Sequence, residues 1–431
     1  MHFILHVITN RALGANATTF ALLFAELLAI LIIPSILIKK KGRPISALAW
    51  LLTVLSIPYV GVLLWWTLGR NHLKRVQRFN RFRDKSVPQY NRENTEPSML
   101  DKLVRHRLDF NRRGIFRPTR NNHIDVYSSG PEYFSEFKAS ISSAKNEILL
   151  LYYIWKCDET GKEIRDLLIQ KSNEGVKVRV IVDNFGSLAF LGSFSKPLRD
   201  AGVEVSGFLP PRFWPWAPTF NFRNHRKLLC IDGTTSFLGG INIGNEYKYD
   251  WRDVAIKITG PASQQLEKVF LEDWAFSTKQ IVKPTSVESR LESGSDECTV
   301  VASGPDCDLN CSLEILFQLI SIAKERVWIQ TPYFVPPSSI CAALRAAVQR
   351  GVDVRIMLPQ KNDVYLVGLA SRSYYESLLD SGVSIFEYTK EFLHSKTAIV
   401  DDYTLIGSSN IDSRSFQLNF ELGGIVRSTH I

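Results

Sequence analysis

The chain repeats one order of secondary-structure patterns, and this repeat limits its fold more than any other feature. Each half contains a β-rich apolar run, a helical stretch and a buried-strand pattern, in that order: 146–154, 160–173 and 175–183 in the first half, and 325–334, 339–350 and 351–359 in the second. This alternation predicts an α/β fold with mostly parallel strands and covering helices. Two copies predict two similar lobes facing each other, with a pocket at their interface.

Each copy then reaches the pattern H-x-K-x₄-D. The motif residues are His225, Lys227 and Asp232 in the first copy, and His394, Lys396 and Asp401 in the second. Each motif is followed by a small-residue turn that contains an asparagine: Gly239-Gly240-Ile241-Asn242 and Gly407-Ser408-Ser409-Asn410. One copy could be a coincidence on a half-buried strand, but two matched copies indicate a functional site.

A duplicated His-Lys-Asn set provides what one symmetric phosphodiester site needs. One histidine can attack phosphorus and form a phosphohistidine, while the other protonates the leaving oxygen. Lys227 and Lys396 would balance charge on the non-bridging oxygens. Asn242, Asn410 and Ser408 would donate further hydrogen bonds to those oxygens.

Four carboxylates accompany the motifs, and two roles are expected. Asp253 is 11 residues after Asn242, and Glu421 is 11 residues after Asn410. At these matched positions we expect them to orient the reacting imidazoles. The motif residues Asp232 and Asp401 stand at odd offsets from the His-Lys pair, so on a strand they face away. We therefore expect them to hold the following turn.

The N-terminal 70 residues contain two apolar stretches, about 18–38 and 45–68, each near the ~20 residues that cross a bilayer. A cleaved signal peptide is the alternative for the first, but the basic run 39–41 and a second apolar stretch follow it. We expect a transmembrane hairpin, or a re-entrant one. More Lys and Arg follow the second stretch than lie between the two, so the remainder is predicted on the cytoplasmic side. Residues 71–120 are expected to form a basic linker that lies against anionic lipid.

Two differences between the copies are informative. The first copy has an aromatic and proline-rich insert at 210–220 (PPRFWPWAPTF), which is either a packed surface loop or a lip that faces lipid or substrate. The second copy ends at Ile431, before any counterpart of the helix expected at about 261–276. The predicted lobes are therefore 121–280 and 281–431, the latter shortened at its C-terminus.

Charge and cysteine content narrow the class of protein. The formal net charge of +9 fits an anionic partner, either lipid or nucleic acid. The six cysteines form no metal-binding pattern, and we expect reduced thiols in a cytosol-facing domain. No metal site is visible, and no cofactor is expected.

At the duplicated motif the chain resembles the phospholipase D superfamily, and over nearly its whole length it is similar to bacterial cardiolipin synthases. Beyond the motif, the resemblance rests on six strings: Trp65-Trp66-Thr67-Leu68-Gly69-Arg70, Tyr152-Tyr153-Ile154-Trp155, Gly239-Gly240-Ile241-Asn242-Ile243-Gly244, Trp251-Arg252-Asp253, Gln330-Thr331-Pro332-Tyr333-Phe334 and Asn410-Ile411-Asp412-Ser413-Arg414-Ser415-Phe416. The chain departs from the superfamily motif in two ways. Gly240 replaces a serine, and five residues instead of six separate Asp401 from Gly407.

The resemblance implies two phospholipase D-like lobes, a duplicated α-β-α sandwich, after the membrane hairpin. It implies that a phosphatidyl group passes from one phosphatidylglycerol to His225 and then to a second phosphatidylglycerol, giving cardiolipin and glycerol without a metal. In the superfamily, the motif residues Asp232 and Asp401 count as part of the site, and His394 would be the acid. Phosphatidylglycerol and anionic membrane lipid are the expected partners, in a multi-pass membrane protein of undetermined oligomeric state.

Three alternatives remain open at this point. The same site could belong to a hydrolytic phospholipase D or another phosphatidyltransferase. It could also belong to a nuclease, although the hairpin and the aromatic insert argue against nucleic acid as a partner. An inactive membrane scaffold is the third alternative, and the intact His225 and His394 oppose it.

Overall fold

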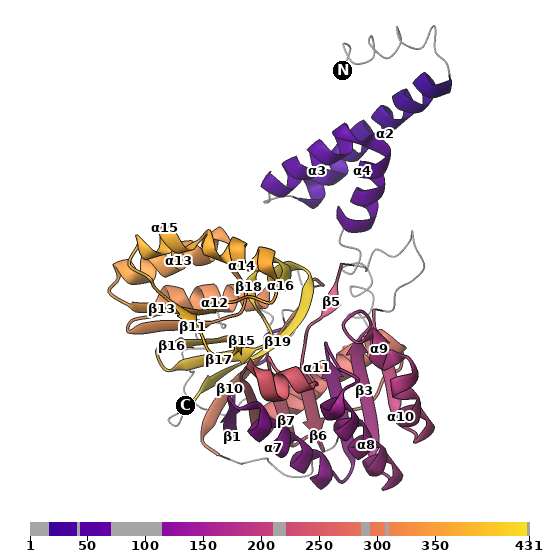
Figure 1. The fold of residues 1–431 in the computed structure, drawn as a ribbon, viewed down its shortest axis with the longest axis vertical. Coiled ribbons are helices and arrows are strands. Elements are labelled where there is room, and N and C mark those ends of the chain that lie inside the picture. The colour runs from indigo at the N-terminus through magenta and orange to yellow at the C-terminus, as the bar shows by residue number, and fades with distance from the viewer. Residues whose placement is uncertain are drawn as a thin grey trace. The chain divides into compact units, whose positions relative to one another are not determined.

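The computed structural model describes residues 17–40, 44–69, 114–209, 221–285, 294–306 and 310–428. They form an N-terminal helical unit and a larger α/β unit, which are described separately (Figure 1). Almost all of the predicted basic linker and the whole aromatic insert at 210–220 lie outside the described residues. Those predictions, and the domain boundaries that depend on them, stay predictions.

The N-terminal unit begins with one long apolar helix, α2 (Ala17–Lys39). Its segment Thr19–Lys39 has 21 residues and a mean hydropathy of 2.6, so it is long and apolar enough to cross a membrane. Among the described residues it is the single helix that meets both conditions. The remaining elements of the unit are α3 (Pro44–Ser56), α4 (Pro58–Leu64) and the π-helical turn η1 (Trp65–Gly69).

The second predicted span is not one continuous helix. It divides at Ile57, because Pro58 lacks an amide hydrogen and disfavours helical backbone at the residue before it. A Cβ on Gly61 would lie 2.6 Å from the carbonyl oxygen of Thr53, so α4 packs directly against the end of α3. Trp65 is fully buried against Trp50, with ring centroids 5.4 Å apart.

The α/β unit contains the two predicted repeats. The elements of the first are β1 (Thr119–Tyr127), α7 (Gly130–Ser143), β2 (Glu147–Tyr152), α8 (Glu159–Asn173), β3 (Lys177–Asp183), α9 (Leu188–Leu191), η3 (Ser193–Ser195), α10 (Lys196–Asp200), β4 (Glu204–Phe208), β5 (Arg223–Asn224), β6 (Leu228–Ile231), β7 (Thr235–Gly239), η4 (Glu246–Asp250), β8 (Trp251–Arg252), β9 (Ala255–Thr259) and α11 (Pro261–Thr278). The elements of the second are β10 (Asp296–Ser303), α12 (Cys311–Ile322), β11 (Arg326–Gln330), β12 (Phe334–Val335), α13 (Ser338–Gln349), β13 (Asp353–Pro359), α14 (Tyr365–Arg372), α15 (Tyr375–Leu379), β14 (Ser384–Tyr388), β15 (Phe392–Leu393), β16 (Thr397–Val400), β17 (Tyr403–Gly407), β18 (Ile411–Asp412), α16 (Ser413–Gln417) and β19 (Asn419–Arg427).

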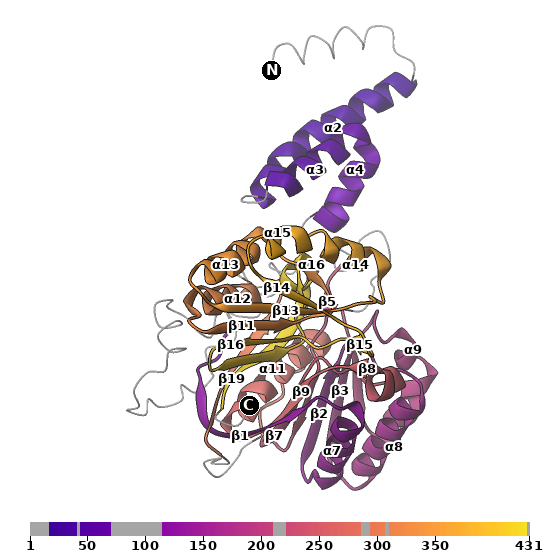
Figure 2. The ribbon, with the colours of Figure 1, turned by 60° about the vertical axis from the view of Figure 1, so that its left-hand side comes forward.

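The two lobes share one continuous sheet. Its strand order is β14-β13-β11-β16-β17-β19-β10-β1-β9-β7-β6-β2-β3-β4, with β5 attached to β19. The order from β10 outward matches the order from β1 outward, strand for strand, so the lobes are related by an approximate two-fold at the antiparallel β1–β10 pair (Figures 1 and 2). The predicted duplication is confirmed, and it forms a single sheet.

The predicted excess of parallel strands is wrong. Along the main strand order, parallel pairs occur at the outer strands of each lobe: β2, β3 and β4 in the first, and β11, β13 and β14 in the second. The short pairs β5–β19, β8–β15 and β12–β18 are also parallel. The inner strands are antiparallel because the chain returns from β6 to β7, and from β16 to β17, through tight turns. Parallel neighbours need a long crossover, which the outer strands have.

Helices cover the faces of the sheet differently in the two lobes. Every residue of β2 is buried, because α7 and α8 cover one face of the first lobe and α11 covers the other. In the second lobe, α12 and α13 pack on one face against the core that includes Val327 and Ile329. Alternate residues of β11 on the opposite face are partly exposed, among them Trp328, whose ring lies between Arg326 and Arg355.

Candidate active site

Short cross-lobe pairings place the two histidines. β5, which ends just before His225, pairs with the start of β19 in the second lobe, and the amide of His225 donates to the carbonyl of Phe420 at 2.8 Å. β15, which ends just before His394, pairs in the same way with β8 of the first lobe, and the amide of His394 donates to the carbonyl of Arg252 at 2.8 Å. Each histidine is therefore held beside the segment of the opposite lobe that carries a matched carboxylate.

The carboxylates pair with the histidines crosswise. Nδ1 of His225 lies 3.0 Å from Oε2 of Glu421, and Nδ1 of His394 lies 2.6 Å from Oδ2 of Asp253. Asp253 and Glu421 were expected to orient imidazoles, and the structure brings them to that position. Each serves the histidine of the other copy, so both lobes contribute to both halves of the site. A carboxylate on Nδ1 leaves Nε2 as the ring nitrogen available to a substrate.

The two lysines complete the cluster. Nζ of Lys227 donates to the carbonyl of His225 at 2.7 Å, and Nζ of Lys396 donates to the carbonyl of His394. Nζ of Lys396 also lies 2.9 Å from Nδ1 of His394 and 3.9 Å from Oδ2 of Asp253. Both lysines are almost fully buried. Two lysines and two imidazoles therefore lie together in one buried cluster.

The small-residue turns differ between the copies for a steric reason. Ser408 donates to Oε2 of Glu421 and accepts from the amide of Leu422 at 3.0 Å, so it anchors that carboxylate. Gly240 occupies the equivalent position beside Asp253. A Cβ there would lie 2.2 Å from Oδ1 of Asp253, so a serine would force that carboxylate to move. The pair Gly240 and Asp253 beside His394 therefore corresponds to the pair Ser408 and Glu421 beside His225.

The predicted asparagines have unlike surroundings. Oδ1 of Asn242 accepts from the amide of Ile154 at 3.2 Å, which fixes the orientation of its amide. Oδ1 of Asn410 is buried and has no hydrogen-bond partner within the described part of the chain. A buried polar atom without a partner is costly unless something else satisfies it, so this atom fits contact with a ligand.

The two motif aspartates lie away from the cluster. Each has a positive φ, near 50°, at the end of its strand. The carboxylate of Asp232 accepts from the amides of residues 145–147, each at 2.8 Å, and that of Asp401 accepts from the amides of residues 324–326 at 2.9 to 3.0 Å. Five residues along a strand place Asp232 about 16 Å from Lys227. These aspartates anchor the entry of β2 and β11, not the following turn, and the structure does not bring them to the histidines.

Burial sets the charge of the imidazoles. It lowers the pKa of His225, although Glu421 opposes the effect. Burial and the neighbouring Lys396 lower the pKa of His394 to about 3, even though Asp253 favours its charged form. The free site therefore keeps both imidazoles neutral near pH 7.

Burial also acts on the lysines and carboxylates. It lowers the pKa of Lys396 to about 8 and that of Lys227 well below the usual lysine range. Burial alone would raise the pKa of Asp253, but Lys396 and His394 outweigh it and leave that pKa below the usual range. The pKa of Glu421 is lowered in the same way, against burial, by its paired histidine and by Lys227. The carboxylates are therefore charged.

A family comparison matches this duplicated arrangement. The family described as cardiolipin synthase, phospholipase D-like domain, matches residues 137–274 and 316–431, which lie in the two repeats and together exceed half of the chain. The chain belongs to the cardiolipin synthase family.

Individual relatives agree with the family over most of their length. The cardiolipin synthase of Halalkalibacterium halodurans is 36% identical over 417 residues, which are 91% of this chain and 82% of the relative. The major cardiolipin synthase of Bacillus subtilis is 37% identical over 417 residues, covering 91% of this chain and 86% of the relative. A solved structure, phosphatidylserine synthase of Haemophilus influenzae, matches with a TM-score of 0.56 at 19% identity, over 71% of this chain and 82% of that chain. The last likeness shows the fold alone.

Aromatic rings around the histidines were not predicted as site residues. In this member of the cardiolipin synthase family, the ring of Tyr153 lies 4.9 Å from that of His225, and Nζ of Lys227 lies 5.4 Å from the centre of the Tyr153 ring. Trp251 lies 4.8 Å from His394, ring to ring. Both aromatic residues belong to strings that carried the family resemblance, so the signal was present without a role attached. The rings pack directly against the imidazoles.

A buried ion pair next to His225 was also missed. Arg226 donates to Oδ2 of Asp273 on α11 at 2.7 Å, and to the carbonyls of Ser303 and Glu421 in the second lobe. Asn224 donates to the same carboxylate oxygen at 3.0 Å. In this cardiolipin synthase family member, Arg226 therefore connects both lobes directly behind the first motif.

Proposed function

We propose that this protein is a cardiolipin synthase, a phosphatidyltransferase that joins two phosphatidylglycerol molecules and releases glycerol. The observation that carries the proposal is the crosswise arrangement of His225 with Glu421 and His394 with Asp253 around two buried lysines. The names of the relatives give the substrate class, phospholipid. The pair of imidazoles supports transfer through a covalent intermediate.

In the first half-reaction, Nε2 of His225 attacks the phosphorus of one phosphatidylglycerol. The bond from phosphorus to the headgroup glycerol breaks, and that alkoxide takes a proton from His394 and leaves as glycerol. In the second half-reaction, a headgroup hydroxyl of another phosphatidylglycerol gives its proton to His394 and attacks phosphorus. The bond to His225 breaks, and cardiolipin is released.

The charges of the site support this order of events. A general acid must be protonated, yet burial and Lys396 hold His394 neutral in the free protein. A bound phosphodiester adds a negative charge beside the lysines, and this charge raises the pKa of a neighbouring imidazole. Substrate binding would therefore load the proton that the leaving alkoxide needs. The buried Lys227 and Lys396 would neutralise charge on the non-bridging oxygens, while the unpartnered Oδ1 of Asn410 could only accept a hydrogen bond, for example from a headgroup hydroxyl.

The N-terminal unit supports a location at the membrane. The helix α2 is long and apolar enough to span a bilayer, and the net charge of +9 favours anionic lipid. We propose a membrane-anchored enzyme whose α/β unit lies on the cytoplasmic side, with a second crossing formed by α3 and α4 together.

The test is product analysis in membranes that contain labelled phosphatidylglycerol. The unaltered protein should form labelled cardiolipin and glycerol, and His225→Ala should form neither. His123→Ala is the matched control, because His123 is exposed and pairs only with Asp125 among the described carboxylates. Phosphatidic acid without cardiolipin would identify a hydrolase instead. Cardiolipin from the His225→Ala protein would rule out His225 as the nucleophile.

A further inference from the structure

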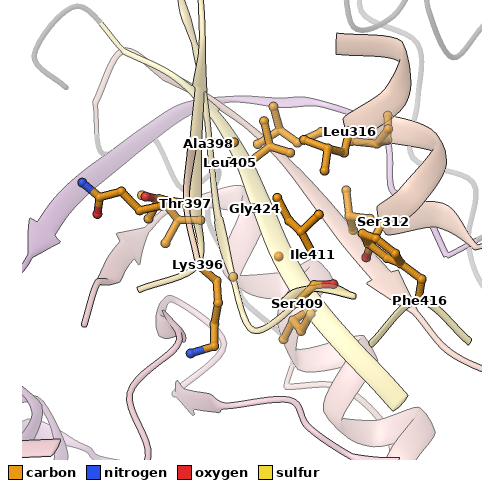
Figure 3. Close-up of a pocket in the computed structure, with 18 residues that line it drawn as sticks. Ser312, Leu316, Lys396, Thr397, Ala398, Leu405, Ser409, Ile411, Phe416 and Gly424 are labelled. Atoms are coloured by element: carbon orange, nitrogen blue, oxygen red, sulfur yellow. The ribbon is translucent and has the colours of Figure 1, made fainter. Parts of the chain in front are cut away.

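An apolar cavity lies in the second lobe next to the proposed site. It has a volume of about 80 Å³ and sits between α12 and the strands β16, β17 and β19 (Figure 3). Leu316, Leu405 and Phe416 contribute to its apolar wall, while Lys396 and Ser409 line the end that belongs to the catalytic cluster. One buried water molecule requires only about 10–15 Å³ by the same measure, so the space is several times larger than a small packing defect.

The first lobe is filled at the equivalent place. Counted from the starts of β2 and β11, Tyr133 corresponds to Ser312 and Phe137 corresponds to Leu316. Phe237, at the middle of β7, corresponds to Leu405 at the middle of β17. The rings of Tyr133, Phe137 and Phe237 pack together in the first lobe, with centroids 5.5 to 5.9 Å apart.

A glycine on strand β19 adds to the empty space in the second lobe. Gly423 stands two residues after Glu421, where the first lobe has Ala255 two residues after Asp253. A Cβ on Gly423 would meet nothing closer than 3.4 Å, so neither crowding nor backbone conformation requires glycine there. Four smaller side chains therefore coincide at this place in the second lobe. Because empty apolar space is costly, a hollow produced by all four suggests an occupant.

We propose that this cavity binds a short length of acyl chain of a phospholipid substrate, next to the glycerol backbone. The inference rests on the proposed function and deepens it, because it names how the site distinguishes a lipid phosphodiester from a soluble one. The apolar wall suits methylene groups, and a polar ligand would leave its hydrogen-bonding groups unpaired there. The cavity begins at the stem of Lys396, so a chain that enters it keeps its phosphate at the Nζ end.

The experiment transfers the packing of the first lobe into the second. Leu316→Phe with Leu405→Phe fills the cavity with the two phenylalanines found at Phe137 and Phe237. Leu316→Met with Leu405→Met is the control, because it conserves volume. Release of headgroup glycerol is measured with dihexanoyl phosphatidylglycerol, whose chains carry the acyl carbons proposed to enter the cavity, and with its deacylated analogue glycerophosphoglycerol, which lacks them. Excluding two methylene groups should lower the ratio of acylated to deacylated kcat/KM about tenfold in the phenylalanine variant. The methionine variant should keep the ratio of the unaltered protein.

A second experiment measures lipid binding and does not require catalytic turnover. Phosphatidylglycerol with a diazirine on the acyl carbons nearest the glycerol is photolysed with His225→Ala protein, and the labelled peptides are mapped. Label on α12 or β19 that the phenylalanine pair removes supports the pocket, even if the protein forms no cardiolipin. Label confined to other surfaces, or a ratio of acylated to deacylated kcat/KM unchanged by the phenylalanine pair, overturns the proposal. Thermal unfolding of each variant verifies that it is folded.

Discussion

Gly240 provides the sharpest test of the crosswise geometry. In Gly240→Ala the new Cβ would lie 2.2 Å from Oδ1 and 2.7 Å from Oδ2 of Asp253. The backbone cannot give way easily, because the amide of Gly240 is bonded to the carbonyl of Val254 at 3.0 Å. An ordinary contact therefore requires the carboxylate to retreat by about 1 Å. That movement breaks its 2.6 Å bond to Nδ1 of His394.

The size of the effect follows from the lost bond. A hydrogen bond to a charged group contributes about 1.5–3 kcal/mol, so kcat for cardiolipin formation should fall roughly 10- to 100-fold. Substrate affinity should change much less, since the lysines stay in place. Labelled phosphatidylglycerol in mixed micelles gives both constants. Gly192→Ala is the control, because the nearest atom to its new Cβ is 3.4 Å away.

A second substitution should repair the first. Gly240→Ser combined with Asp253→Glu copies the Ser408–Glu421 pair of the other lobe, so it should recover most of the activity that Gly240→Ser alone loses. Full activity in Gly240→Ala, with unfolding temperature unchanged, would refute the claim that Asp253 acts by holding His394. Equal losses in the single and double serine variants would refute the equivalence of the two pairs.

Three further predictions concern charge and stability. Burial lowers the pKa of Lys396 to about 8, so its charged form is lost as pH rises and kcat/KM should decline above about pH 8. Lys396→Arg should shift that decline to higher pH, because arginine stays charged. If the decline stayed at the same pH, another group would be responsible for it. Asp401→Ala removes three hydrogen bonds to backbone amides, so it should lower the free energy of unfolding by about 1–3 kcal/mol with little change in kcat. The neighbouring Asp402→Ala, at an exposed side chain, should change neither stability nor kcat. A large loss of kcat in well-folded Asp401→Ala would show that Asp401 takes part in the chemistry. Arg226→Met leaves Asp273 buried without its cation and should lower the free energy of unfolding by about 3–5 kcal/mol, measured by thermal unfolding. Adding Asp273→Leu should restore most of that stability. If it restored none, the two residues would not act as a pair.

The repeat and the members of the site were predictable from the sequence because both leave local marks. Strand and helix patterns recur in the same order, and the 11-residue offset points to Asp253 and Glu421, which the structure places against the imidazoles. Their crosswise pairing was not predictable. An offset shows that two residues are equivalent, but it cannot show whether each serves its own copy or the other one. That depends on the β5–β19 and β15–β8 pairs, which are two residues long and carry no periodic signal.

Other predictions were wrong because a sequence pattern does not determine how strands pair or whether a helix is continuous. Alternating strands and helices suggested parallel strands, but the tight turns after Asp232 and Asp401 return the chain beside itself and make the inner pairs antiparallel. The apolar composition of 45–68 suggested one spanning helix, yet the single residue Pro58 divides it. The cavity beside Lys396 becomes visible only when the two lobes are compared in register, because Ser312 and Leu316 are unremarkable by themselves.

The crosswise carboxylates also have a consequence for the time at which the enzyme becomes reactive during synthesis. His225 is translated early, but its partner Glu421 leaves the ribosome almost two hundred residues later. Until β19 joins the sheet, the proposed nucleophile lacks the carboxylate that is proposed to orient it. A product of interrupted translation that stops before Glu421 would therefore lack one half of the crosswise pairing. The proposed site is complete only when the last strand of the sheet is in place.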